Sequence, residues 1–113
     1  MIKRLAGTST TRSRAVVHNG LVYAVSTAST KTRSFHQQTK DALGELDRTL
    51  AECGTSKARL LMVTVYIADI AQKLEMNRAW DEWVDRTNPP QRACIGAALE
   101  GEDLVEIVAV AAI

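Results

Sequence analysis

The chain has 113 residues, of which 46% are hydrophobic and 24% charged, a composition typical of a globular protein rather than a disordered or fibrous one. Its 14 Lys and Arg residues against 13 Asp and Glu residues leave a formal charge of +1, so no strong field selects nucleic acid, an anionic membrane or an acidic partner. This length fits one domain, residues 1–113, whose small core leaves little room for an enclosed substrate pocket.

The two cysteines, Cys53 and Cys94, are too few for a disulfide framework, and neither has the Cys or His spacing of a zinc site. Residues 1–20 contain no apolar stretch of the kind found in a secretory signal. The longest apolar run, Ile107–Ile113, is far shorter than the roughly 20 residues of a membrane span. We therefore expect a cytoplasmic protein with no metal and no membrane association.

Two β-rich runs, Ser13–Asn19 and Leu21–Ser26, meet at Asn19-Gly20. That dipeptide predicts a tight hairpin, because both residues tolerate the positive φ of a type I′ turn. The polar segment that follows, Ser26–Arg33, is expected to be a loop. Ile2–Ala6 offers a further short strand, so the sheet is expected to have five or six strands.

A helix is expected to begin at about Ser34, because Ser34 and Gln37 have the spacing of a capping box, and to end at Gly54. Apolar residues recur along it at helical spacing and define one face: Phe35, Ala42, Leu43, Leu46 and Leu50.

Leu60–Ala68 is a nearly continuous, β-branched apolar run, which predicts a central strand covered on both faces. Asp69 with Gln72 resembles the start of a second helix, and Asn88-Pro89-Pro90 ends it. The apolar face expected for this helix consists of Leu74, Met76, Trp80, Trp83 and Val84.

Arg92–Ala98 and Leu104–Ile113 complete the order β-β-α-β-α-β-β, which predicts an α+β fold with a mixed sheet. Two helices cover only one face of such a sheet. The other face also carries aliphatic residues, and leaving it in water would expose an unusually large apolar patch. We therefore expect that face to be buried against further copies of the chain, in an obligate homo-oligomer.

Arg92 and Glu106 stand out within otherwise small or apolar strands. A guanidinium suits a carboxylate ligand, since its five donors form a fixed fork. The alternative for Arg92 is an ordinary exposed arginine at the end of a strand. Glu106 is a catalytic acid or base, a member of a structural ion pair, or a solvated group at an edge.

Three further positions carry weaker signals. Strand alternation puts Cys94 on the same face as Arg92, where packing explains a cysteine more simply than covalent catalysis does. Asn77 is unusual inside a helix and is either a hydrogen-bonding fixture or a solvated group. Ser26 and Thr27 offer hydroxyl groups to a ligand, although such loops are common.

Pro90-Gln91-Arg92-Ala93-Cys94, followed by Val105-Glu106-Ile107, resembles the carboxy-terminal signature of the RidA (YjgF-type) family of imine and enamine deaminases. The resemblance extends over nearly the whole chain, including the Asn19-Gly20 hairpin and the Gln38–Leu43 helix. It implies a chorismate-mutase-like fold with two helices on one face of the sheet. It also implies a homotrimer with sites in the clefts between subunits.

The resemblance implies that Arg92 holds the substrate carboxylate and Glu106 orients a water, with Cys94 and Asn77 lining the same site. The implied reaction is hydrolysis of a 2-imino acid or its enamine, such as 2-aminoacrylate or 2-iminopropanoate, to a 2-oxo acid and ammonia, with no cofactor. Three departures from the family concern the rim of the site, and one of them is a short loop before the first helix. Val25-Ser26-Thr27-Ala28 replaces a Ser-Gly-Gln turn, and Arg12 lies near the position of a frequent aromatic residue.

Two other functions remain open. One is a non-catalytic trimer that binds small carboxylates or acts like a chaperone. The other is a ribonuclease, which the balanced charge and the lack of a histidine pair disfavour.

Overall fold

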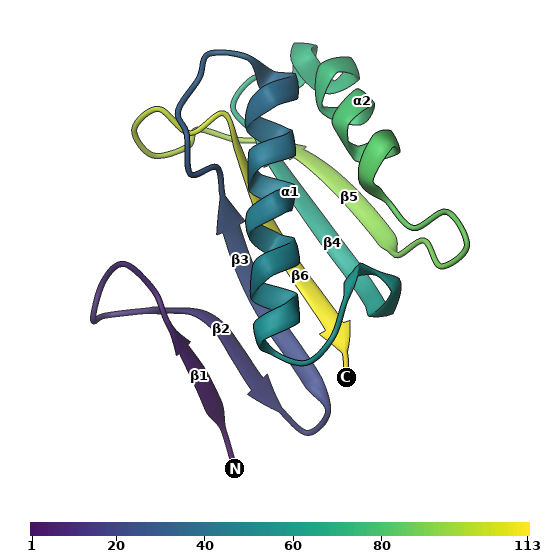
Figure 1. Ribbon diagram of the computed structural model, residues 1–113. Coiled ribbons are helices and arrows are strands. Elements are labelled where there is room, and N and C mark those ends of the chain that lie inside the picture. Colours follow the sequence, from purple (N-terminus) through teal and green to yellow (C-terminus); the bar gives the residue numbers. More distant parts are fainter.

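The computed structural model describes all residues, 1–113, and has two layers, a six-stranded sheet and two helices (Figure 1). The strands are β1 (Lys3–Ala6), β2 (Ser13–His18), β3 (Leu21–Thr27), β4 (Leu60–Ile67), β5 (Gln91–Gly96) and β6 (Val105–Ala112). The helices are α1 (Phe35–Glu52) and α2 (Lys73–Trp83), with short 3₁₀ turns η1 (Lys57–Arg59) and η2 (Ile70–Gln72) before β4 and α2. The α+β class and the sixth strand at the N-terminus are confirmed.

The strand order is β1-β2-β3-β6-β4-β5, and only the β4–β5 pair is parallel. This pair is parallel because α2 carries the chain back between the two strands, whereas β2 and β3 are joined directly by a hairpin. The expected mixed sheet is therefore confirmed. The last strand, β6, is inserted between β3 and β4, which makes it a central strand.

Local signals set the hairpin and the ends of α1. Asn19 and Gly20 have φ of 51° and 77°, as the predicted turn requires. Ser34 caps α1 by accepting a hydrogen bond from the Gln37 amide at 3.1 Å. The helix ends at Glu52, and Gly54 follows with φ of 81°.

The second helix begins later than its capping signal suggests. Asp69 does accept a hydrogen bond from the Ala71 amide, at 3.0 Å, but the turn that it caps is η2, and α2 proper begins at Lys73. Leu74 is wrong as a member of the buried face, because 77% of it is exposed. It lies about 200° around the helix from the buried Met76, since each residue turns an α-helix by about 100°.

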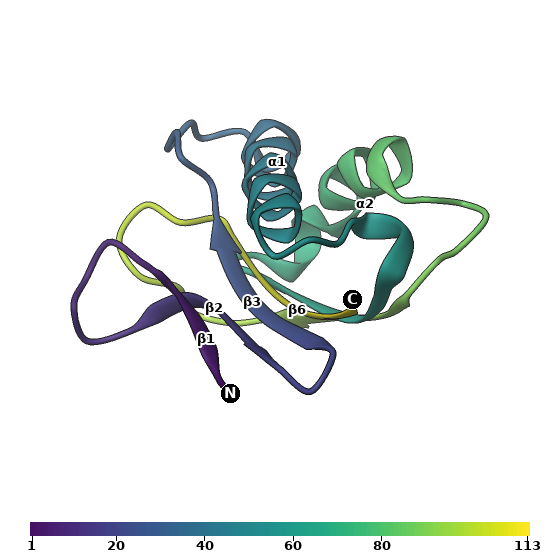
Figure 2. The ribbon, with the colours of Figure 1, turned by 60° about the horizontal axis from the view of Figure 1, so that its bottom comes forward.

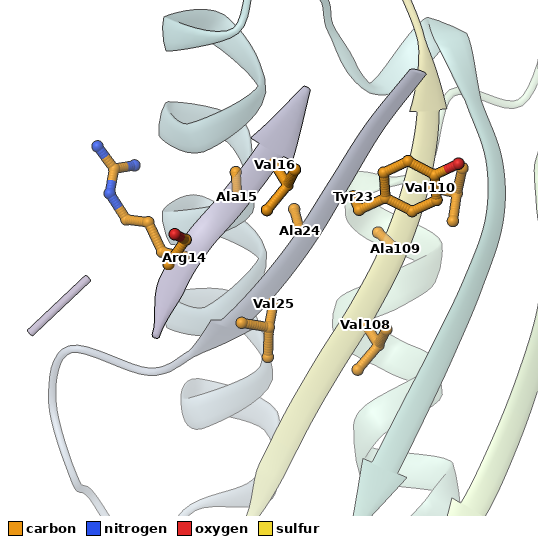
Figure 3. A pocket seen from close by; sticks show the side chains of 10 residues that line it. Arg14, Ala15, Val16, Tyr23, Ala24, Val25, Val108, Ala109 and Val110 are labelled. Carbon is orange, nitrogen blue, oxygen red and sulfur yellow. The ribbon is translucent and has the colours of Figure 1, made fainter. Parts of the chain in front are cut away.

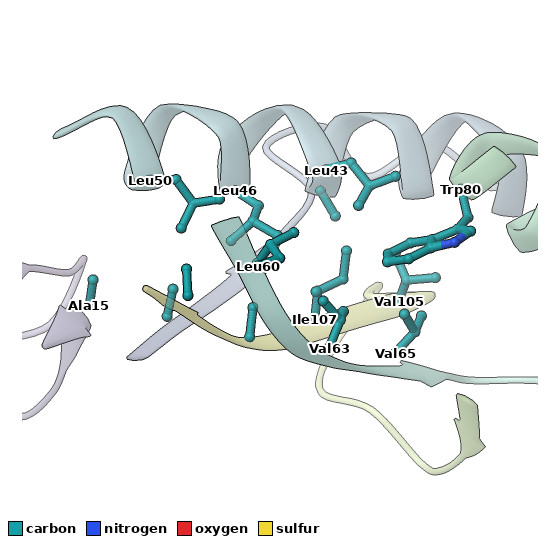
Figure 4. Packing of buried hydrophobic residues seen from close by; sticks show 14 of the residues in the cluster. Ala15, Leu43, Leu46, Leu50, Leu60, Val63, Val65, Trp80, Val105 and Ile107 are labelled. Carbon is teal, nitrogen blue, oxygen red and sulfur yellow. The ribbon is translucent and has the colours of Figure 1, made fainter. Parts of the chain in front are cut away.

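The core lies between the helices and one face of the sheet. Side chains of α1, among them Leu43, Leu46 and Leu50, point towards Val63, Val65 and Ile107 of the sheet (Figure 4). Trp80 of α2 joins the same cluster. Both helices lie on one side of the sheet (Figure 2), as expected.

The opposite side, here called the open face, is bare within the chain. Five large apolar side chains on it are exposed, from 38% for Val25 to 47% for Tyr23. The other three are Met62, Ile95 and Val108. The sequence predicted that β4 is covered on both faces. Within one chain, only the face towards the helices is covered. None of the helices has the length and apolarity needed to cross a membrane.

Candidate functional site

Arg92 and Cys94 lie on the helix side of the sheet. In the parallel pairing, Arg92 is opposite Val63 and Cys94 is opposite Val65. Directly paired residues point to the same face, and both valines are buried under the helices. The strand β5 is at the edge of the sheet, so Arg92 emerges at the rim of the molecule, half-buried beside α2.

The guanidinium of Arg92 has an aromatic support but no oxygen acceptor. Its Cζ atom lies 5.3 Å from the centre of the Trp80 ring. Its only hydrogen bond within the chain is a weak one from Nη1 to the thioether sulfur of Met76, at 3.7 Å. It forms no ion pair, so stacking holds the cation in place while nearly all its donors stay free.

Asn77 is the next residue along α2 after Met76. Its Oδ1 atom is buried and has no hydrogen-bond partner. An unsatisfied buried carbonyl oxygen costs about 1–3 kcal/mol. The Asn77 side chain therefore keeps a free hydrogen-bond acceptor on α2, the helix that supports Arg92. Such an acceptor suits a ligand that carries a hydrogen-bond donor.

Glu106 lies on the open face. In β6 it is paired with Thr27 of β3 on one side and Tyr66 of β4 on the other. Its neighbour Ile107 points into the core. The half-buried carboxylate forms no hydrogen bond or ion pair within the chain, so the structural ion-pair interpretation of Glu106 is not supported.

Glu106, Ser26 and Thr27 line one hollow of about 750 Å³, between the β1–β2 loop, the β3–α1 loop and the β5–β6 loop. Most of its lining is polar. The hydroxyl of Ser26 is already used, since it donates to the carbonyl of Ala42 at 2.6 Å. Thr27, which is paired with Glu106, has no such bond and is the better placed of the two to meet a ligand.

Ion pairs neutralise most charges around this hollow. Lys31 binds Asp103 at 2.5 Å, and Arg14 and Glu45 pair with Glu52 and Arg48. The lining residues left without an ion pair are Arg12, Glu100 and Glu106. No cluster of three or more ligating side chains that would hold a metal ion is found.

A second, shallow groove of about 230 Å³ crosses the open face beside this hollow. Figure 3 shows its apolar lining, with Tyr23, Val25, Val108 and Val110 from β3 and β6. The groove has the apolar character of a packing surface more than that of a reaction site.

One chain therefore does not bring the sequence-derived candidates together. Arg92 and Cys94 lie on β5 on the helix side, where Arg92 contacts Met76 and Trp80 of α2, the helix that also carries Asn77. Glu106 and Thr27 lie on the open face. Two further contributors were not expected from the sequence. Trp80 supports Arg92, and Gln38 ties together the loops of the hollow. Trp80 has the helical spacing of a core residue, which gives no sign of the cation on its ring.

Comparisons with known proteins agree on one family. The sequence model described as endoribonuclease L-PSP matches residues 3–113. A RutC family protein of Haemophilus ducreyi is 46% identical over 103 residues, 89% of this chain and 88% of that protein. A RutC family protein of Haemophilus influenzae is 37% identical over 102 residues, 88% of each chain. A crystal structure of a YjgF family member from Neisseria meningitidis has a TM-score of 0.93 at 37% identity, covering 99% of this chain and 94% of the other.

Proposed function

Because the chain belongs to the endoribonuclease L-PSP family, which includes the YjgF and RidA-type proteins, we propose that it hydrolyses reactive 2-imino acids or their enamine tautomers. The products are a 2-oxo acid and ammonia. The imine carbon is already electrophilic, so the protein has to hold the substrate carboxylate and direct one water.

The observation that carries this proposal is the state of Arg92. It is half-buried, stacked on Trp80 and supplied with no acceptor except a thioether sulfur. A guanidinium with free, fixed donors matches a carboxylate in a two-bond arrangement. A solvated surface arginine would need neither the aromatic support nor the partial burial.

The second catalytic group in the proposal is Glu106. Its carboxylate accepts a proton from water as the water oxygen bonds to the imine carbon. That proton passes to the imine nitrogen, which gives the neutral carbinolamine. The hydroxyl of the carbinolamine then gives its proton to the carboxylate, which passes it to the amine nitrogen, so that the carbon–nitrogen bond breaks and ammonia leaves as the carbonyl forms. The carboxylate is thereby restored, and the chain and water alone supply every group used.

Since Arg92 and Glu106 lie on opposite faces of one sheet, a site that uses both requires two chains. We infer a homotrimer in which the β5 edge of one subunit meets the Glu106 hollow of the next. Two features support this assembly: the apolar open face, which a second copy would cover, and the position of Arg92 on an edge strand.

The test is a coupled assay. An amino-acid oxidase generates the 2-imino acid, semicarbazide traps what remains, and the protein is expected to accelerate its decay. Arg92→Ala should lower kcat/KM by about 100-fold or more, because a charge-assisted two-bond contact is lost. Glu106→Gln should lower kcat while leaving pyruvate binding nearly intact, and Arg78→Ala, an exposed arginine on α2, serves as control.

Two results would change the assignment. Full activity in Arg92→Ala would overturn the catalytic role of the arginine. Pyruvate binding that depends on Arg92, without any acceleration of imine decay, would instead identify a carboxylate-binding protein. RNA cleavage is not favoured, because His18 bonds to the Met1 carbonyl, His36 pairs with Glu82, and neither lines the hollow.

A further inference from the structure

Gln38 is the most deeply buried amide of the chain, with no exposed surface, and its three hydrogen bonds leave the helix that carries it. Its Nε2 group donates to the carbonyl of Thr32 at 3.0 Å and to the carbonyl of Glu102 at 2.9 Å. Its Oε1 atom accepts from the amide of Leu104 at 2.8 Å. One side chain thus joins the β3–α1 loop, the β5–β6 loop and the start of β6.

These two loops are walls of the hollow that contains Glu106. The β3–α1 loop contributes Ser29 and Lys31 to its lining, and the β5–β6 loop contributes Glu100 and Asp103. A salt bridge between Lys31 and Asp103 links the same two loops at the surface. Gln38 provides the buried link beneath it.

Side chains, not backbone pairing, fix the β3–α1 loop: besides Gln38, Thr30 bonds to Asp41 of α1, and Lys31 bonds to the Ala28 carbonyl and to Asp103. None of the backbone–backbone hydrogen bonds outside the helices and strands involves residues 29–33. The amide oxygen of Gln38 accepts from the amide of Leu104, and this bond fixes the chain two residues before Glu106. The β6 residue Glu106 is in turn paired with Thr27, where β3 gives way to the loop.

We propose that Gln38 is a positioning residue for the site: its amide N–H groups set the wall that meets the substrate side chain, and its oxygen sets the strand that carries Glu106. This inference rests on the proposed function. The amide nitrogen and the amide oxygen of Gln38 have separate tasks, so different substitutions can remove them separately.

Gln38→Glu keeps the size and the oxygen facing Leu104 but removes the two N–H donors to the loops. It is expected to raise KM by about 10-fold, as the loss of two hydrogen bonds implies, with kcat within about twofold of the parent. Gln38→Met removes all three bonds and is expected to lower kcat by about 10-fold as well. Thr39→Val is the control, because it deletes a buried hydroxyl that bonds to Phe35 within the same helix.

Hydrogen exchange supplies a readout that does not depend on turnover. Amides of residues 28–33 and 99–104 should exchange faster in both Gln38 variants than in the parent or in Thr39→Val. If the parent shows no deaminase activity, the proposed function fails, while the exchange pattern still decides whether Gln38 holds the loops. Unchanged exchange in both loops, or a KM and kcat in both variants that match Thr39→Val, would overturn the proposal.

Discussion

Replacing Trp80 by leucine tests whether the aromatic ring prepares Arg92 for a carboxylate. The guanidinium carbon lies 5.3 Å from the ring centre, within the range of a cation–π contact. Such contacts contribute about 0.5–1 kcal/mol at exposed sites and about 2 kcal/mol when desolvated, and Arg92 is half-buried. We therefore expect a loss of about 1 kcal/mol, or a roughly fivefold weaker affinity for pyruvate.

The measurement is calorimetric titration of pyruvate, a 2-oxo acid of the product class, at a temperature well below unfolding. Trp80→Phe should fall between the parent and Trp80→Leu, since a phenyl ring is a weaker cation acceptor than indole. The leucine variant also leaves a cavity in the core, so its melting temperature is expected to fall.

Trp83→Leu separates the loss of stability from the loss of the cation contact. Its ring lies 5.6 Å from that of Trp80 and faces Lys57 instead of Arg92. We expect this variant to lose stability, through packing and through its bond to Asp47, yet to bind pyruvate as the parent does. Equal weakening in both leucine variants, or parental affinity in Trp80→Leu, would refute the reasoning.

Three further outcomes are expected. Val108→Lys places a charge on the open face and should convert the proposed homotrimer to monomers in sedimentation velocity, whereas Leu74→Lys on the outer side of α2 should not. An unchanged mass for Val108→Lys would contradict burial of the open face between subunits. Asn77→Ala removes an unpartnered buried oxygen, so the ligand-free melting temperature should hold or rise while pyruvate affinity falls, and a lower ligand-free value would argue against it. Burial raises the pKa of the Cys53 thiol, an effect that nearby Lys3 and Arg14 only partly offset, so the unfolded chain ionises first and stability should decline as pH rises above about 8.5. Urea denaturation of Cys53→Ala should show less of that alkaline loss, and an identical pH dependence would exclude the thiol as its source.

Much of the secondary structure could be predicted because its signals are local. The Asn19-Gly20 turn and the Ser34 cap each act within a few residues. The Asn88-Pro89-Pro90 signal does not set the end of α2, because the helix already ends at Trp83, five residues before Asn88. The second helix shows the limit of this approach. Asp69 is a true capping residue, yet the backbone forms a 3₁₀ turn first, so the side of α2 that meets the core excludes Leu74.

The partners of the candidate residues could not be predicted in the same way. Gln38 bonds to Leu104 across 66 positions of sequence, and Arg92 lies over a ring that has the spacing of an ordinary core residue. Such contacts depend on which elements become neighbours. The spacing of residues along one strand or helix does not show which other elements will pack beside it.

The sequence by itself determined the type and order of the main helices and strands, the residue types suited to carboxylate chemistry, and an aliphatic second face of the sheet that two helices leave uncovered. Strand alternation also related Arg92 to Cys94, because they share a strand. Only the tertiary structure decided how Arg92 stands relative to Glu106. The insertion of β6 between β3 and β4, in a register that pairs Glu106 with Thr27 and Tyr66, turns the carboxylate to the open face while Arg92 faces the helices. The physical reason is that alternation fixes faces within a strand, whereas pairing between distant strands fixes them for the sheet.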